Sequence, residues 1–259
     1  MSTGRVVFVG AGPGAADLIT LRGARALGAA EVVLFDALTD PALRDLAPNA
    51  RWIDVGKRGF CDSTAQTAIN AKLVKYGSSQ QVVRLKGGDP SVFGRLEEEL
   101  LALHEVNIAC EVVPGVTAAI AAAALTQRPL TRRGTGRSVS LTTAMTREGE
   151  LQAARSADTE VFYMAGRQLP SLSRKLLEAG WPADTPICVV SRAGCTDQIA
   201  SDHTVASLAA AALLHQGRPA VVTVGAGAKA LIPVHSAAQK PAKSLGLDMP
   251  HGSKRAITV

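Results

Sequence analysis

The sequence predicts two α/β domains, the first built on a mostly parallel sheet, with a ligand cleft between the domains. Three observations support this prediction. Short β-branched and apolar runs alternate with helical patterns up to Pro114, the alternation starts again after it, and polar or glycine-rich loops follow four of the runs. Alternating strands and helices are typical of parallel sheets with both faces covered. The boundary between two such domains is a usual place for a ligand.

The first half of the chain contains five expected strands. They lie at residues 5–9, 31–35, 52–55, 82–86 and 109–113. Leucines and alanines at helical spacing predict a helix at about 20–29. A Ser-Thr-Ala-Gln capping box opens a second helix at 63–76, and a third is expected at 96–104. Because the carboxyl ends of parallel strands share one edge, we expect the loops there to form the site.

The second half repeats the alternation with different lengths. Strands are expected at 138–143, 160–164, 187–191 and 220–224, and helices at 118–125, 169–179 and 205–214. Ile199 lies in a short extra strand that we expect to pair antiparallel. The predicted domains are therefore 1–115 and 116–235. A basic tail at 236–259 follows, which we expect to be disordered.

Composition excludes several classes of protein. A hydrophobic content of 47% and a charged content of 19% describe a globular chain of 259 residues. Aromatic residues make up 3%, which argues against a single-stranded nucleic-acid partner, and about half of the net charge of +6 lies in the tail. The four cysteines form no CxxC pair and the histidines no HxxxH pair, so no metal site is expected. Without a long apolar run, the sequence predicts a cytoplasmic protein with no membrane partner.

The most informative loop follows the strand at 82–86 and reads GGDP. Gly87 and Gly88 let a ligand approach the backbone, and Pro90 biases Asp89 towards an extended conformation. Asp89 is therefore a candidate ligand-binding carboxylate. The same pattern also suits a simple turn in which Asp89 caps the next helix.

A second glycine loop, GAGPG, follows the first strand. With Asp36 at the end of the second strand, it has part of the arrangement of a dinucleotide fingerprint, which would predict a nicotinamide oxidoreductase. Pro13 interrupts this loop, however, and the next helix starts near Thr20, too late to place its N-terminus against a pyrophosphate. We therefore do not favour a nicotinamide cofactor.

Seven segments carry a family resemblance. In chain order they read GAGPGAADLITLRG, LFDAL, VGKRG, VVRLKGGDPSVFGR, EVVPGVTAA, PLTRR and FYMAG. Together they resemble the S-adenosylmethionine-dependent tetrapyrrole methylases, over about Arg5 to Gly225. The resemblance implies a homodimer whose two α/β domains hold S-adenosyl-L-methionine in the cleft between them, with S-adenosyl-L-homocysteine as product. GAGPG would then belong to that cleft.

The resemblance also implies site residues, each transferred by its matching motif. Those expected to contact the cofactor are Pro13, Gly87, Gly88, Asp89, Val92, Thr117, Ala118, Met164 and Ala193. Asp36 and Lys57 match the family's acid–base pair, in which a carboxylate takes a ring proton and an ammonium holds a substrate carboxylate or returns a proton. The arginines expected to bind substrate carboxylates are Arg22, Arg58, Arg132 and Arg133.

The implied activity is C-methylation of the tetrapyrrole uroporphyrinogen III at two ring carbons, giving precorrin-2 for siroheme or cobalamin biosynthesis. Some segments depart from that pattern. Leu96 stands where most relatives have a glycine pair, and GAADLITLRG and Thr143-Ala144 resemble a later cobalamin-pathway methylase of the precorrin-4 kind. A non-catalytic regulatory protein that keeps the S-adenosylmethionine pocket is an alternative of another class.

Overall fold

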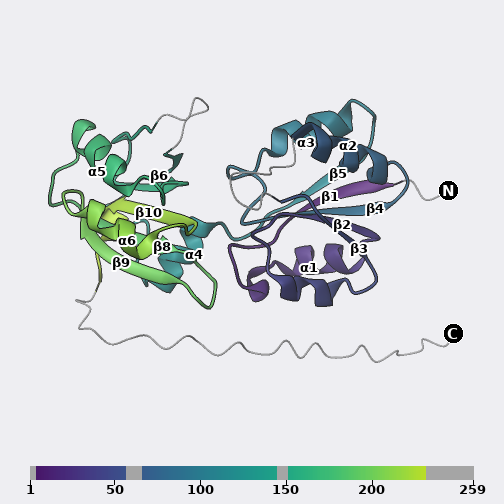
Figure 1. The fold of residues 1–259 in the computed structure, drawn as a ribbon, viewed down its shortest axis with the longest axis horizontal. Coiled ribbons are helices and arrows are strands. Elements are labelled where there is room, and N and C mark those ends of the chain that lie inside the picture. The colour runs from purple at the N-terminus through teal and green to yellow at the C-terminus, as the bar shows by residue number, and fades with distance from the viewer. Residues whose placement is uncertain (1–3, 57–65, 145–150, 232–259) are drawn as a thin grey trace.

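The computed structural model describes residues 4–56, 66–144 and 151–231. These residues form two lobes, each with its own five-stranded sheet, joined through the segment between β5 and α4 (Figure 1). The expected boundary at 115/116 falls in this joining segment. The carboxyl ends of the first sheet's strands point towards the second lobe.

The first sheet, predicted to be mostly parallel, is fully parallel. Its strands are β1 (Arg5–Gly10), β2 (Val32–Phe35), β3 (Arg51–Asp54), β4 (Gln81–Lys86) and β5 (Ala109–Val113). They lie in the order β3-β2-β4-β1-β5, and each neighbouring pair runs parallel. The loops after these strands therefore lie along one edge of the sheet.

Helices cover both faces of this sheet. They are α1 (Leu21–Gly28), α2 (Gln66–Gly77) and α3 (Leu96–His104), with 3₁₀ turns at η1 (Ala16–Leu18) and η2 (Pro41–Leu46). The core beneath α1 contains Leu27 and Leu43, and the core beneath α2 and α3 contains Leu73 and Leu103, all fully buried. Burying one such leucine contributes about 1.5–3 kcal/mol. Packing on two faces thus fixes the sheet whose edge carries the loops.

The second sheet is mixed. It consists of β6 (Val139–Thr143), β7 (Thr159–Tyr163), β8 (Pro186–Ser191), β9 (Ile199–Thr204) and β10 (Ala220–Gly225), in the order β6-β7-β10-β8-β9. Only β6 and β7 run parallel among these neighbouring pairs, and the expected antiparallel pairing of the Ile199 strand is confirmed. The accompanying helices are α4 (Ala118–Leu125), α5 (Leu169–Glu178) and α6 (Ala211–His215), with η3 (Leu208–Ala210) and η4 (Ala226–Ala228).

The helix predicted at 205–214 starts later than expected. The hydroxyl of Ser207 accepts a hydrogen bond from the backbone N–H of Thr204 at 2.9 Å, and the N–H of Ser207 donates to the Thr204 carbonyl at 3.1 Å. These local bonds hold a turn where the sequence pattern indicated helix, because serine and threonine side chains compete with the helical backbone for partners. Regular α-helix begins only at Ala211.

Candidate active site

Three loops at the edge of the first sheet meet through their backbones. Gly88 donates its N–H to the Gly12 carbonyl at 2.7 Å, and Gly12 donates to the Gly88 carbonyl at 3.3 Å. A Cβ atom at Gly10 would lie 2.5 Å from the Gly115 Cα, closer than any side chain tolerates. The loops after β1, β4 and β5 therefore form one continuous surface of main chain, for which glycine is required at Gly10 and at Gly88, where φ is +71°.

Asp89 ties two of these loops together. Its Oδ1 accepts the N–H of Ser91 at 2.8 Å, and its Oδ2 accepts the N–H of Gly115 at 2.8 Å. The first bond is the turn cap that the sequence allowed. The second links the end of β4 to the end of β5. Since each carboxylate oxygen accepts more than one hydrogen bond, Asp89 keeps capacity for a ligand.

Tyr163 of the second lobe packs against these loops. The sequence reasoning missed this residue. Its hydroxyl lies 2.7 Å from Thr117 Oγ1 and accepts the N–H of Ala119 at 3.2 Å. Its ring lies 5.0 Å from that of Phe93, between centroids. An aromatic residue with a polar tip at the end of an apolar strand was the available signal. Tyr163 thus joins the GGDP loop to the start of α4.

Met164, directly after Tyr163, has two unusual properties for a methionine. Its φ is +60°, a conformation rare for residues other than glycine, and its side chain is 55% exposed. Such backbone strain, of order 1–3 kcal/mol, concentrates at ligand sites. Met164 therefore has the features of a residue placed for a ligand and not for the core.

The loop after β8 packs against the loop after β1. The N–H of Ala15 donates to the Gly194 carbonyl at 2.9 Å, and a Cβ at Gly194 would lie 3.4 Å from Cγ of Pro13. Ala193, which precedes Gly194, is buried at 4% exposure. Val92 donates its N–H to the Asp89 carbonyl at 3.2 Å, and Ala118 is the first residue of α4. Eight of the nine residues expected to contact the cofactor thus lie on the loops that meet here, and Ala118 opens the adjoining helix.

Asp36, at the end of β2, is held by a buried arginine. Nη2 of Arg84 donates to its Oδ1 at 2.6 Å, and the Asp36 side chain is 30% exposed. The following loop packs against the GGDP loop, since a Cβ at Gly87 would lie 3.4 Å from Cβ of Leu38. The predicted catalytic carboxylate and the predicted cofactor loop are therefore neighbours.

Two buried cations and one buried carboxylate lie behind Asp36. Glu99 of α3 binds both Arg84 and Lys86 of β4. Burial lowers the pKa of the Lys86 ammonium, and the adjacent Arg84 charge lowers it further. Burial also acts to lower the pKa of Arg84, but the carboxylates of Asp36 and Glu99 outweigh it, and that pKa is raised.

Two of the remaining predicted residues, Lys57 and Arg58, lie outside the described residues. The preceding Gly56 packs against the Asp36 loop, because a Cβ there would lie 2.0 Å from the backbone N of Ala37. Arg22 is exposed in the first turn of α1, and Arg133 is exposed after α4.

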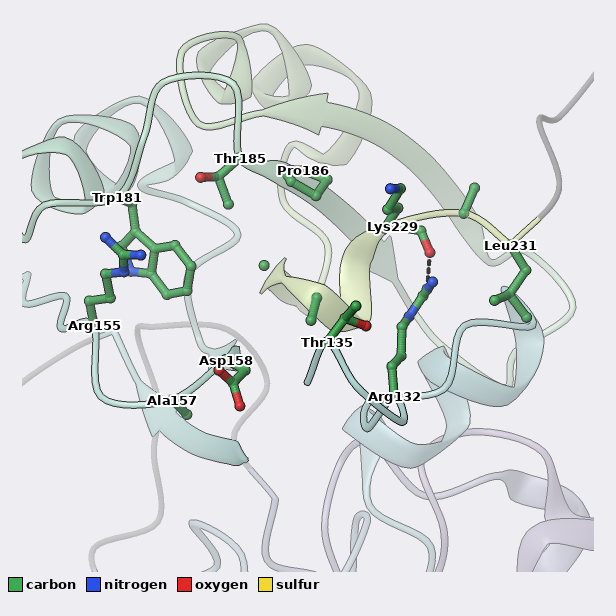
Figure 2. Close-up of a pocket in the computed structure, with 13 residues that line it drawn as sticks. Arg132, Thr135, Arg155, Ala157, Asp158, Trp181, Thr185, Pro186, Lys229 and Leu231 are labelled. Atoms are coloured by element: carbon green, nitrogen blue, oxygen red, sulfur yellow. Dashed lines mark hydrogen bonds between the residues drawn. The ribbon is translucent and has the colours of Figure 1, made fainter. Parts of the chain in front are cut away.

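Arg132 lies in a different place from the loops described above. It lines a cavity of about 560 Å³ with Asp158, Trp181 and Lys229, and it donates a hydrogen bond to the Lys229 carbonyl (Figure 2). Asp158 directly precedes β7, whereas Met164 directly follows it. This cavity and the Met164 loop are therefore at opposite ends of a five-residue strand, on the order of 15 Å apart.

Comparison with known proteins places the fold and these motifs in one family. The sequence profile of the Tetrapyrrole (Corrin/Porphyrin) Methylases matches residues 5–209. The chain belongs to the tetrapyrrole methylase family. A uroporphyrinogen-III C-methyltransferase of Pseudomonas aeruginosa is 42% identical to it over 201 residues, which is 76% of this chain and 82% of that protein. A siroheme synthase of Psychrobacter is 39% identical over 239 residues, and the chain spans about half of that protein's length (48%).

Solved structures of tetrapyrrole methylases confirm the predicted fold class. A uroporphyrin-III C-methyl transferase of Thermus thermophilus, complexed with S-adenyl homocysteine, is 33% identical with a TM-score of 0.75, covering 86% of this chain and 97% of that one. A cobalt precorrin-4 methyltransferase is 27% identical with a TM-score of 0.77, covering 87% and 96%.

In residues 4–56, 66–144 and 151–231, His, Cys, Asp and Glu side chains form no group of three that could hold a metal ion. Within the same ranges, each helix falls short of the length and apolar character needed to cross a bilayer.

Proposed function

We propose that this tetrapyrrole methylase transfers methyl groups from S-adenosyl-L-methionine to two ring carbons of uroporphyrinogen III, giving precorrin-2. The observation that carries the proposal is the packing of the Asp36 loop against Gly87, which places a partly exposed carboxylate beside the glycine-rich cofactor loop. The 42% identical relative named uroporphyrinogen-III C-methyltransferase supports this choice of substrate.

The glycine-rich edge fits a cofactor that lies against main chain. A Cβ at Gly88 would meet only Thr117 Cα, at 3.9 Å, so a side chain there would occupy the space beside Thr117 that the cofactor needs. The exposed Met164 side chain offers an apolar contact on the other lobe. The residues that we propose to contact the cofactor are Pro13, Gly87, Gly88, Asp89, Val92, Thr117, Ala118, Met164 and Ala193.

The cofactor supplies an electrophilic methyl group bonded to a positively charged sulfur. A pyrrole carbon attacks this methyl carbon, the new carbon–carbon bond forms as the carbon–sulfur bond breaks, and sulfur keeps the bonding electrons. The macrocycle then loses a proton, which we assign to Asp36. Arg84 binds Oδ1, and no hydrogen bond within the described residues engages Oδ2, which is therefore the oxygen that we propose receives the proton.

The remaining residues of this proposal bind and align the substrate. Uroporphyrinogen III carries eight carboxylates. Correct alignment of its ring carbon with the methyl group and the sulfur lowers the activation barrier by on the order of 7–11 kcal/mol. We propose that Lys57 holds a substrate carboxylate or returns a proton, and that arginines bind the other carboxylates. The arginines are Arg22, Arg58, Arg132 and Arg133. Arg132 has the weakest support, because it lines the cavity at the far end of β7.

A later precorrin methylase is the second candidate, and one observation favours it. The cobalt precorrin-4 methyltransferase has a slightly higher TM-score than the Thermus thermophilus protein, 0.77 against 0.75. Its sequence identity is lower, 27% against 33%, and substrate choice depends on side chains more than on the backbone path. We therefore keep uroporphyrinogen III as the first candidate.

Incubation with methyl-labelled S-adenosylmethionine tests the proposal. Uroporphyrinogen III and a precorrin-4 preparation are supplied separately, and the product masses are measured. We expect two labelled methyl groups on uroporphyrinogen III. Label only in the precorrin-4 product would establish the second candidate. Binding of S-adenosylhomocysteine by calorimetry, with no label in either tetrapyrrole, would support a non-catalytic regulatory protein.

We also propose that the enzyme works in the cytoplasm as a homodimer, without a nucleic-acid partner. The family resemblance supports the dimer, and the low aromatic content argues against binding of single-stranded nucleic acid. Sedimentation equilibrium of the purified protein tests the dimer, and a mass equal to the 26.8 kDa monomer at all concentrations would reject it.

A further inference from the structure

The end of β4 places two cations inside the protein. Arg84 and Lys86 are two residues apart on the strand, so their side chains point to the same face of the sheet. That face is covered by α2 and α3, and Val82, on the same face, packs there with Leu103. Arg84 and Lys86 nevertheless have side-chain exposures of only 3% each. Charges at such depth are found only when they are paired.

Glu99 provides the pairing from α3. Its Oε1 accepts from Nε of Arg84 at 3.0 Å, and its Oε2 accepts from Nζ of Lys86 at 2.7 Å. Nε2 of Gln66 also donates to Oε1, at 3.3 Å. The Glu99 side chain is 1% exposed. With Asp36, the cluster holds two positive and two negative charges and is neutral.

The rigid guanidinium group of Arg84 connects Glu99 to Asp36. Its Nε binds Glu99, its Nη1 donates to the carbonyl of Leu85 at 3.2 Å, and its Nη2 donates to Asp36 at 2.6 Å. Because the guanidinium is planar, the two bonds to Glu99 and Leu85 fix the direction in which Nη2 points. The position of the Asp36 carboxylate therefore depends on an acceptor at Glu99.

We infer that Glu99 is a positioning residue for the methyl transfer, which acts through Arg84 to hold the Asp36 carboxylate where it receives the ring proton. This inference rests on the proposed function of Asp36. Glu99 is buried behind Arg84, so its role is to orient and not to touch the substrate. Lys86 balances the negative charge of Glu99. The positive charge of Arg84 is then balanced by Asp36. A buried ion pair is weak evidence for stability alone, since apolar side chains of similar volume often serve as well.

Two charge-neutral double variants separate positioning from structure. K86M/E99M and K86M/E99Q remove the same two charges, but only E99Q keeps an oxygen that accepts the bond from Nε of Arg84. We expect kcat of K86M/E99M to fall about 100-fold below that of K86M/E99Q, the loss expected when a reacting group shifts by about 1 Å. The KM for uroporphyrinogen III and the affinity for S-adenosylhomocysteine should be equal in the two variants.

A second comparison asks whether the effect passes through Asp36. In the D36N background, exchanging E99Q for E99M should change kcat no further, because residues acting as one unit are not additive. Equal kcat values for the two double variants, or a difference that persists in the D36N background, would overturn the inference. So would a difference confined to KM or to cofactor affinity.

The single variant R84K gives a test if K86M/E99M does not fold. It keeps the charge, but a single ammonium cannot bind Glu99 and Asp36 with the fixed geometry of a guanidinium. We expect reduced kcat with unchanged cofactor affinity, and wild-type kcat in folded R84K would contradict the inference. If D36N itself turned over at the wild-type rate, the proposed function of Asp36 would fail. A slow D36N with unaffected Glu99 and Arg84 variants would reject only the inference about Glu99.

Discussion

The carboxylate of Asp89 accepts the backbone N–H of Gly115 at 2.8 Å, which joins the ends of two strands that are separated by β1 in the sheet. The same carboxylate caps its own turn through Ser91. Asp89 therefore holds the shape of the surface that we propose to bind the cofactor. Any contact with the cofactor would add to this role.

Replacing Asp89 by alanine is expected to weaken cofactor binding. The variant loses charge-assisted hydrogen bonds worth about 1.5–3 kcal/mol each, and the Gly115 loop loses its tether. Calorimetry with S-adenosylhomocysteine measures the loss, and S91A serves as the control because it keeps the backbone N–H that Asp89 binds. Unchanged affinity in D89A would show that the loop holds its shape without this carboxylate.

The backbone contact between Gly10 and Gly115 predicts an intolerant position. A Cβ at Gly10 would lie 2.5 Å from Gly115 Cα, and the Gly115 backbone is tethered by its hydrogen bond to Asp89. We expect G10A to destabilise the fold by about 3 kcal/mol or more, the upper end of the usual cost of overpacking. G134A is the control, since its Cβ meets nothing within 4 Å and only its positive φ opposes the change, at a cost of about 1–2 kcal/mol. Urea unfolding of both variants measures whether G10A loses more stability than G134A.

Tyr163 makes hydrogen bonds to the start of α4 that can be removed without altering its ring contact with Phe93 of the first lobe. In Y163F the ring contact with Phe93 is kept, but Thr117 Oγ1 and the Ala119 N–H lose their partner. We expect a loss of about 0.5–1.5 kcal/mol of stability per hydrogen bond, measured by urea unfolding. If Y163F unfolded at the wild-type midpoint, these bonds would contribute nothing net, and Tyr163 would act through its ring alone.

Much of the first domain could be predicted from local pattern. Apolar runs that end in glycine or aspartate gave the strands, and parallel pairing then placed Asp36 and the GGDP loop at one edge without further information. The helix predicted at 205–214 was wrong at its start because Thr204 and Ser207 bond to each other's backbone, which helical periodicity does not reveal.

The contacts between distant segments could not be predicted. Glu99 appeared as one of three acidic residues in a polar helix, and nothing in its spacing indicated that it alone would be buried against Arg84. Likewise, the bond between Ala15 and Gly194 joins segments about 180 residues apart, so it depends on how the lobes pack. Family resemblance supplied the candidate residues, whereas the structure supplied the partners that hold them.

The proposed proton acceptor predicts a separation between binding and turnover. D36N keeps the size of the side chain and an oxygen that accepts from Arg84, but an amide does not take up a proton at neutral pH. We expect turnover of uroporphyrinogen III to fall by about 100-fold or more, the usual contribution of a general base, while affinity for S-adenosylhomocysteine is kept. Loss of that affinity instead would assign Asp36 to the cofactor ribose.

Burial of His215 is expected to make the free energy of unfolding depend on pH, without involving the active site. The side chain is fully buried, and its Nε2 and Nδ1 lie 2.8 Å and 3.0 Å from the hydroxyls of Ser201 and Ser191. Burial, followed by the nearby His203 and Arg218, lowers its pKa from 6.5 to about 4. Because the unfolded chain binds this proton first, the stabilisation is complete above pH 6.5 and is lost as the pH falls towards 4, by at most about 1.4 kcal/mol per pH unit. Urea unfolding at about pH 7 and about pH 5 should therefore show a smaller loss of stability for H215N than for the unchanged protein, because asparagine takes up no proton in this range. Equal losses in the two proteins would mean that His215 takes up its proton over the same pH range in the folded and the unfolded chain, so that burial does not lower its pKa.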